Sequence, residues 1–362
     1  MLKPIDKRLQ VSPFMVLYLI TSVQVGVGVL GFQPLLLVAN HDGWIAVLLA
    51  GLMVHFIIWI LYKLIQNGKG DLIDIHQQAF GKWVGNSFSL SVMLYYIFTC
   101  ITVLRSYIEV VQVWIFPDLP TWSFALVFMM LIYYVVTGGF RTVAGICFFS
   151  VIMPAYLALT FFFPLKFAKW ENLMPLFDIN IKPLFTASLH MTLSYLGFSV
   201  LLVFHPFIKD GEKTQKWAQL GTLVTTALYV FIEIITIVYY SRDQLKVVTW
   251  PTLGLWKIAE LPFVERFEFI GIATWLLVIL PNITMFLWAA SRIGKRVFGY
   301  KQKYFLVAIL IIVFVGCIYF ESRETIDKLN SHVSNLGKYY NFVYIPFLFI
   351  IHSIIIKVRK SK

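Results

Sequence analysis

Long runs of apolar residues, separated by short polar connections, follow one another along almost the whole chain. A membrane-spanning helix needs about 20 mostly apolar residues. Ten runs approach or exceed this length, at approximately 13–39, 44–62, 86–116, 121–138, 142–164, 185–207, 217–240, 267–291, 304–320 and 339–356. The longer connections, at 63–85, 165–184, 241–266 and 321–338, leave no room for a soluble domain. The pattern therefore predicts an all-α polytopic membrane protein with ten transmembrane helices in one domain, residues 1–362.

Glycine and proline interrupt two of these runs. The first run contains three glycines and a proline between Gln24 and Pro34, and the sixth contains Gly197 followed by Pro206. Both residue types disfavour a continuous helix. Interrupted spans in corresponding positions of two halves are typical of inverted-repeat transporters. The sequence therefore predicts a 5+5 inverted repeat (LeuT/APC-like) with broken helices 1 and 6, the repeats covering about 13–164 and 185–356.

A ligand site is predicted between the two breaks. Unwound backbone inside a membrane must find hydrogen-bonding partners, and a small polar ligand could supply them. Spans three and eight would pass the same depth and complete the pocket. The predicted ligand-binding residues are Gly26, Val27, Gly28, Thr99, Val103, Tyr195, Leu196, Gly197, Phe198, Thr284 and Trp288. In the alternative interpretation the glycines only permit close helix packing and Trp288 faces lipid.

Composition narrows the class of protein. The chain is 59% hydrophobic and only 13% charged, whereas soluble domains are about 45–50% apolar and about 25% charged. Its 33 Phe, 18 Tyr and 11 Trp residues argue against disorder. Three cysteines, Cys100, Cys147 and Cys317, lie inside apolar runs and are expected to be buried without partners.

The net charge of +12 comes from basic residues scattered between the runs, so nucleic acid is not expected as a partner. Lys and Arg are more frequent in connections on the side of the N-terminus than on the opposite side. By the positive-inside rule both termini are predicted to be cytoplasmic. The lipid bilayer is the expected surrounding.

Three charged residues fall inside predicted spans. They are Arg105 and Glu109 in span three and Glu233 in span seven. Intramembrane charges cost at least about 2.5 kcal/mol each on insertion scales and are rarely idle. Arg105 and Glu109 share one helical face, which predicts an ion pair between them. Such a pair could act as a latch or proton site, or could only fix the helix register.

Sequence motifs of catalysis are missing from the chain. It contains no Walker A, HExxH, GxSxG or cysteine-rich metal motif. We therefore expect no enzyme activity, no cofactor and no metal.

The order of short motifs resembles the B-subunit (permease-like) family of bacterial spore germinant receptors, within the amino acid–polyamine–organocation superfamily. The motifs are Gly26-Val27-Gly28, Asn40-His41-Asp42-Gly43-Trp44, Asp71-Leu72-Ile73-Asp74-Ile75, Arg105 with Glu109, Tyr195-Leu196-Gly197-Phe198, Trp250-Pro251-Thr252-Leu253 and Arg266-Phe267-Glu268. The resemblance implies a subunit of the spore inner membrane, beside an A subunit and a C lipoprotein. It also implies that the subunit senses a small nutrient, often an amino acid, and triggers germination.

Two departures from the superfamily bear on function. Some members carry a carboxylate shortly after the span-six glycine, whereas Ser199 stands here. Proton-coupled members often use a lysine in span five, and residues 142–164 contain none. Ser199 argues against a cation site at that position. The missing lysine and the motif order favour a nutrient sensor over the alternative, an amino acid or small-solute permease. A purely structural membrane scaffold is the third hypothesis.

Overall fold

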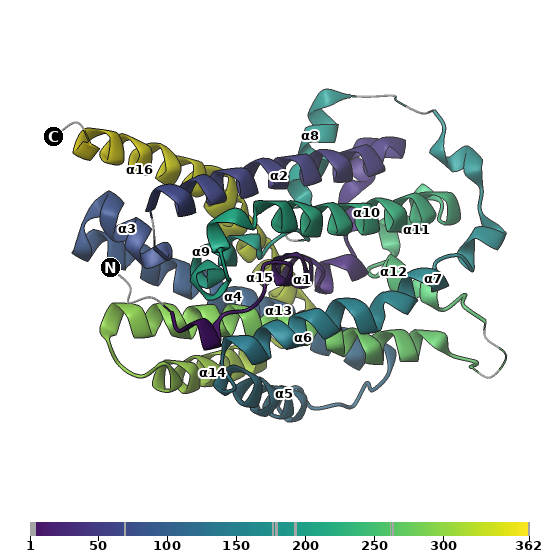
Figure 1. Ribbon diagram of the computed structural model, residues 1–362. Helices are drawn as coiled ribbons and strands as arrows, with labels where there is room; N and C mark the ends of the chain where they lie inside the picture. The colour runs from purple at the N-terminus through teal and green to yellow at the C-terminus, as the bar shows by residue number, and fades with distance from the viewer. Residues whose placement is uncertain are drawn as a thin grey trace.

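Long helices that run roughly alongside one another build the molecule (Figure 1). The computed structural model describes residues 5–68, 70–175, 177, 180–191, 194–260, 262 and 264–360. Seven helical segments are long and apolar enough to cross a membrane, and three shorter apolar helices accompany them at Met15–Gln24, Thr121–Thr137 and Phe198–Phe207. The described residues thus form the all-helical membrane protein that the apolar runs predict.

Helical segments lie within each of the predicted apolar runs. The longer ones are α2 (Gly43–Gly68), α4 (Lys82–Trp114), α5 (Thr121–Thr137), α6 (Phe140–Ile152), α10 (Gln215–Tyr239), α13 (Phe267–Phe298), α14 (Gln302–Tyr319), α15 (Arg323–Tyr339) and α16 (Ile345–Lys360). Short helices α3 (Leu72–Phe80), α7 (Leu157–Thr160), α11 (Arg242–Val247) and α12 (Pro251–Trp256) lie between them. The cysteines Cys100, Cys147 and Cys317 are free and buried, as predicted.

Both predicted helix interruptions are present. Helix α1 (Met15–Gln24) ends before Gly26, and two 3-10 segments, η2 (Val27–Leu30) and η3 (Gln33–Asp42), continue the chain. In the second half, α8 (Ile181–His190) is followed by η7 (Phe198–Val200), α9 (Leu201–Phe204) and η8 (His205–Phe207). Gly197 has a φ of 110°, a conformation that a residue with a Cβ adopts only under strain.

The connection predicted at 321–338 is wrong, because this segment is helical. Helix α15 continues through a π-helical turn, η10 (Tyr340–Tyr344), into α16. Its apolar residues Ile326, Leu329 and Val333 are buried at three- and four-residue spacing, while its polar residues occupy another face. A helix with one polar face is stable within the membrane when that face lines a water-filled cavity.

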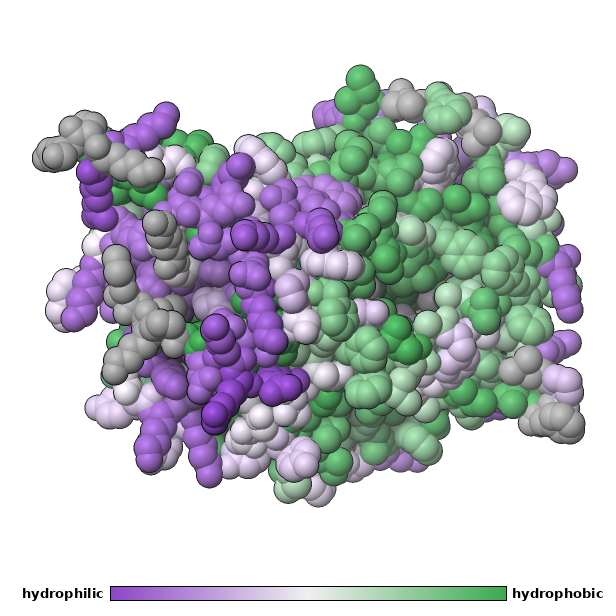
Figure 2. All heavy atoms as spheres, in the orientation of Figure 1, coloured by the Kyte–Doolittle hydropathy of each residue, from purple (hydrophilic) through white to green (hydrophobic). Residues whose placement is uncertain are grey.

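The two ends of the molecule differ in polarity. Both termini lie at the same end, beside α3 and α16 (Figure 1). In the view of Figure 2, hydrophilic side chains gather at that end, a broad apolar surface covers the middle, and scattered hydrophilic side chains appear at the opposite edge. This distribution is typical of a protein whose apolar belt faces lipid and whose charged end faces water.

Candidate functional site

The C-terminal end of α1 leaves backbone carbonyls without partners in the helix, as every helix end does. Asn282 of α13 meets them. Its Nδ2 lies 3.1 Å from the carbonyl oxygen of Ser22, 3.2 Å from that of Val23 and 3.3 Å from that of Val25, and its two N–H groups are shared among them. A single amide from the second half of the chain thus caps the first broken helix.

Other side chains complete this cap. The Tyr229 hydroxyl donates to the carbonyl of Gln24 at 3.1 Å, and Trp275 Nε1 donates to the carbonyl of Gly26 at 3.3 Å. Thr252 Oγ1 donates to the carbonyl of Val29 at 2.7 Å. In this conformation a ligand is therefore not needed to satisfy these three carbonyls or the three that Asn282 caps. Each already accepts from the protein.

The two breaks touch each other. A Cβ on Gly28 would lie 2.9 Å from Ser194 Oγ, and one on Gly197 would lie 2.8 Å from the Val23 carbonyl oxygen. The Tyr229 hydroxyl also lies 2.9 Å from the Ser194 carbonyl oxygen, so its single proton is shared between the carbonyls of Gln24 and Ser194. Close packing, the alternative interpretation of the glycines, therefore accounts for Gly28 and Gly197 in this conformation.

A small central chamber lies between the breaks. Six of the predicted ligand-binding residues line it, namely Gly26, Val27, Gly28, Thr99, Val103 and Leu196. Its volume is about 20 Å³, close to the minimum for one water molecule and too small for an amino acid. Gln24 also lines the chamber, and its Oε1 is buried without a partner among the described residues.

The other five predicted residues are absent from the described lining of the chamber. The Tyr195 hydroxyl faces α10 and donates to Thr226 Oγ1 at 3.2 Å. Thr284 Oγ1 donates to the carbonyl of Leu280 in its own helix, at 2.9 Å. The Trp288 ring centroid lies 4.7 Å from that of Phe140, at a different cavity. Gly197 contacts Val23, and Phe198 is buried in the core.

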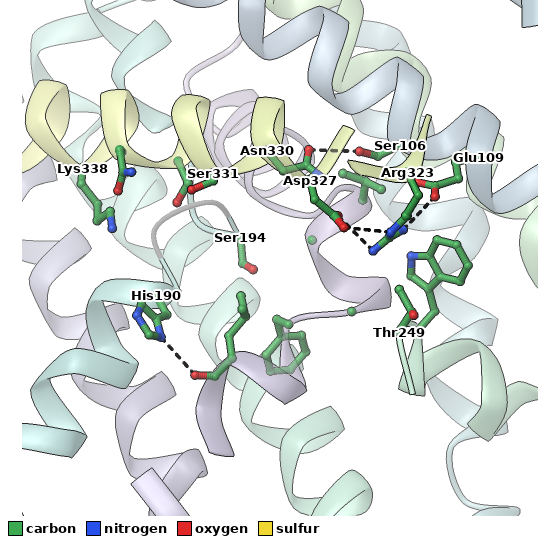
Figure 3. A pocket seen from close by; sticks show the side chains of 18 residues that line it. Ser106, Glu109, His190, Ser194, Thr249, Arg323, Asp327, Asn330, Ser331 and Lys338 are labelled. Atoms are coloured by element: carbon green, nitrogen blue, oxygen red, sulfur yellow. Dashed lines mark hydrogen bonds and ion pairs between the residues drawn. The ribbon is translucent and has the colours of Figure 1, made fainter. Parts of the chain in front are cut away.

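A larger cavity, the vestibule, adjoins the central chamber. Its volume is about 520 Å³, and it shares Val27, Gly28 and Ser194 with the chamber. One wall is the polar face of α15, which carries Asp327, Asn330, Ser331, Ser334, Asn335 and Lys338 (Figure 3). Its size is in the range of small-molecule sites, so the vestibule is the candidate binding site.

Charged groups stand at the two ends of this wall (Figure 3). At one end Arg323 pairs with Glu109 at 2.9 Å and with Asp327 at 3.1 Å. At the other end Lys338 points into the cavity near His190, and no acceptor for its ammonium is found in the part of the chain that the structure describes. The vestibule therefore has an unpaired positive charge, Lys338, at one end and a net negative charge at the other, where two carboxylates share one guanidinium.

The predicted pair of Arg105 with Glu109 is wrong. Arg105 donates instead to the carbonyls of Phe320 at 2.6 Å and Glu321 at 2.9 Å, where α14 ends. Glu109 pairs with Arg323 at one end of the vestibule. The sequence spacing identified the shared helical face but not the partner, because Arg323 lay in a segment predicted as a connection.

Glu233 is buried on α10. A Cβ on Gly43 would lie 2.7 Å from Glu233 Oε1, so this carboxylate lies against the first residue of α2. Its Oε2 has no partner among the described residues.

Sequence reasoning missed Asn282, Ser194 and the polar face of α15. Polar residues in 323–338 recur at three- and four-residue spacing, and this amphipathic pattern was the available signal. No sequence signal pointed to Asn282, because its role depends on a contact between residues 257 to 260 positions apart.

Comparisons with known proteins agree on one family. A family model described as "Spore germination protein" matches residues 10–326. Spore germination protein GerQB of Bacillus cereus is 41% identical over 99% of this chain and 100% of its own length. Spore germination protein A2 of Bacillus subtilis (strain 168) is 24% identical over 94% of each chain.

Among solved structures, a Na+-coupled sialic acid symporter in a substrate-bound outward-open state has a similar fold. The TM-score is 0.68 at 13% identity, and the match covers 94% of this chain and 78% of that one. At this identity the likeness establishes a shared transporter-like fold and nothing about the substrate.

Proposed function

The chain belongs to the family of spore germination proteins, and we propose that it is the membrane subunit of a spore germinant receptor. In this role it binds a small nutrient, such as an amino acid, and triggers germination. The observation that carries the proposal is the vestibule. It is large enough for an amino acid and leads to the contact between the two helix breaks.

The charges of the vestibule favour a ligand with a carboxylate. Arg323 is shared by Glu109 and Asp327, which leaves that end net negative and suited to a ligand ammonium, whereas Lys338 has no acidic partner among the described residues. The carboxylate would meet Lys338, and the serines and asparagines of α15 would hydrogen-bond the rest of the ligand. Triggering then requires Gly28 and Ser194 to part, because the central chamber is closed to an amino acid.

Replacing Lys338 with glutamine is expected to raise the half-maximal germinant concentration about tenfold or more. A hydrogen bond to a charged group contributes about 1.5–3 kcal/mol, and about 1.4 kcal/mol is a factor of ten. The measurement is germination against germinant concentration, for a panel of amino acids, on spores carrying only this receptor.

Lys328→Gln is the matched control, because Lys328 is on the same helix but is paired with Glu324 outside the vestibule. An unchanged response in Lys338→Gln, or an equal shift in Lys328→Gln, contradicts the proposed site.

Uptake of radiolabelled amino acid into vesicles that contain the purified chain tests the permease alternative. Fast, saturable uptake would favour it.

The proposed topology is ten spans in a 5+5 inverted repeat, over about 13–164 and 185–356 of one membrane domain, with both termini cytoplasmic. Seven long and three shorter apolar helices support it. Single cysteines placed at His41 and Asp118 are expected to react with a membrane-impermeant reagent from outside, and one at Lys295 only after permeabilisation. Labelling of Lys295 from outside would overturn the orientation.

The proposed location is the spore inner membrane, where family membership suggests an A subunit and a C lipoprotein as partners. Recovery of these subunits with the tagged chain from solubilised spore membranes would support this assembly.

A further inference from the structure

A second cavity, here called the basic cavity, lies at the end of the molecule that carries the N-terminus. It has a volume of about 460 Å³. The end of α5, the start of α6, the end of α13 and the start of α14 surround it. It shares no lining residue with the vestibule and is not part of the proposed nutrient site.

Four cations line the basic cavity, namely Arg141, Arg292, Lys295 and Lys303, and its described lining includes no acidic residue. The neighbouring Arg296 differs, because Asp71 and Asp74 neutralise it at 3.0 and 2.9 Å. No carboxylate lines the basic cavity itself, and Asp71 and Asp74, which lie close enough to act on Arg292 as well, are the acidic groups nearest to it among the described residues.

Arg292 gives the cavity a buried donor. The residue is only 5% exposed, and its Nε has no hydrogen-bond partner among the described residues. Its guanidinium lies over the Phe207 ring, 4.4 Å from the centroid, and 6.0 Å from the centroid of Trp288. A buried unsatisfied donor destabilises a protein, so a negatively charged acceptor in the cavity would relieve this cost.

The start of α6 adds to the positive electrostatic potential in the basic cavity. Gly139 precedes the first residue of this helix, and no side chain caps it. Free N–H groups and the helix dipole attract anions to such a position. The helix start and Arg292 thus act on one cavity from different elements.

Apolar surface continues from the cavity. On α5 the side chains of Leu131 and Tyr134 are exposed, and on α14 those of Tyr304, Val307 and Ile311 are exposed. Helices α5 and α14 pack against each other. Helix α5 ends at the basic cavity and α14 begins there. We propose that the basic cavity binds the phosphate headgroup of an anionic phospholipid, whose acyl chains lie along α5 and α14. Basic pockets between transmembrane helices commonly bind such headgroups.

The test uses the full-length chain, delipidated in neutral detergent, with lipid binding measured by native mass spectrometry. The probes are phosphatidylglycerol, phosphatidylcholine with the same acyl chains, and inorganic phosphate. Phosphatidylglycerol is expected to bind most tightly. Lys295→Gln and Lys303→Gln should each weaken its binding about fivefold, the usual contribution of one basic residue near a lipid surface.

Lys301→Gln is the matched control, since Lys301 is exposed two residues from Lys303 but does not line the cavity. It should leave binding unchanged. Arg292→Gln should abolish the preference for phosphatidylglycerol, and if this variant does not fold, the two lysine variants decide. Equal binding of both lipids, or an equal loss in Lys301→Gln, overturns the proposal. Displacement of phosphatidylglycerol by inorganic phosphate would instead assign the cavity to a free anion.

Discussion

Asn282→Leu is expected to destabilise the protein by about 3–5 kcal/mol and to lower its level in the membrane severely. Three carbonyls at the end of α1 would lose their donor. Each buried polar group left unpaired costs about 1–3 kcal/mol, and neither lipid nor a closed chamber supplies a replacement. The measurement is the thermal midpoint of the purified chain together with its abundance in spore membranes.

Thr284→Val is the control on the same helix. The Thr284 hydroxyl donates only to carbonyls of its own helix, Leu280 and Pro281, so its removal should cost at most about 1 kcal/mol. Equal stability of the Asn282 and Thr284 variants would show that the amide does not hold the break.

Gly26→Ala should reproduce part of the Asn282 effect. A Cβ on Gly26 would lie 2.9 Å from Asn282 Nδ2, so the added methyl group displaces the amide from the carbonyls. Overpacking of this kind costs about 1–3 kcal/mol. Reduced protein level is therefore expected to accompany any loss of germinant response in this variant.

Arg323→Gln is expected to produce the second large effect, a destabilisation of about 1–3 kcal/mol. It leaves Glu109 and Asp327 without their cation. Breaking a fully buried ion pair costs about 3–5 kcal/mol, but the Arg323 side chain is 47% exposed, and water screens part of this cost. The double variant Glu109→Gln/Arg323→Gln should recover part of the loss, because it removes both charges of the pair.

A double-mutant cycle measured by thermal unfolding gives the coupling between Glu109 and Arg323. A coupling of about 1 kcal/mol or more is expected. The same cycle on Arg105 and Glu109 should give a smaller coupling, since Arg105 donates to the carbonyls of Phe320 and Glu321. A larger coupling for Arg105 than for Arg323 would restore the pairing that the sequence spacing suggested.

Several features of this protein follow from the sequence by itself. Apolar runs as long as a bilayer is thick predict the membrane helices, because lipid accepts few other residues. Gly26, Gly28, Pro34, Gly197 and Pro206 predict the interruptions, because they act on the local backbone. The order of short motifs indicated the family, which the comparisons confirm.

Tertiary structure alone decided how the candidate site is completed. The carbonyls freed at the α1 break are capped by Asn282, Tyr229 and Trp275, and the vestibule wall comes from α15. Partner choice depends on which distant side chains the packed helices bring within about 3 Å, and helix periodicity carries no such information. For this reason the sequence located Glu109 on the correct helix, but only packing paired it with Arg323.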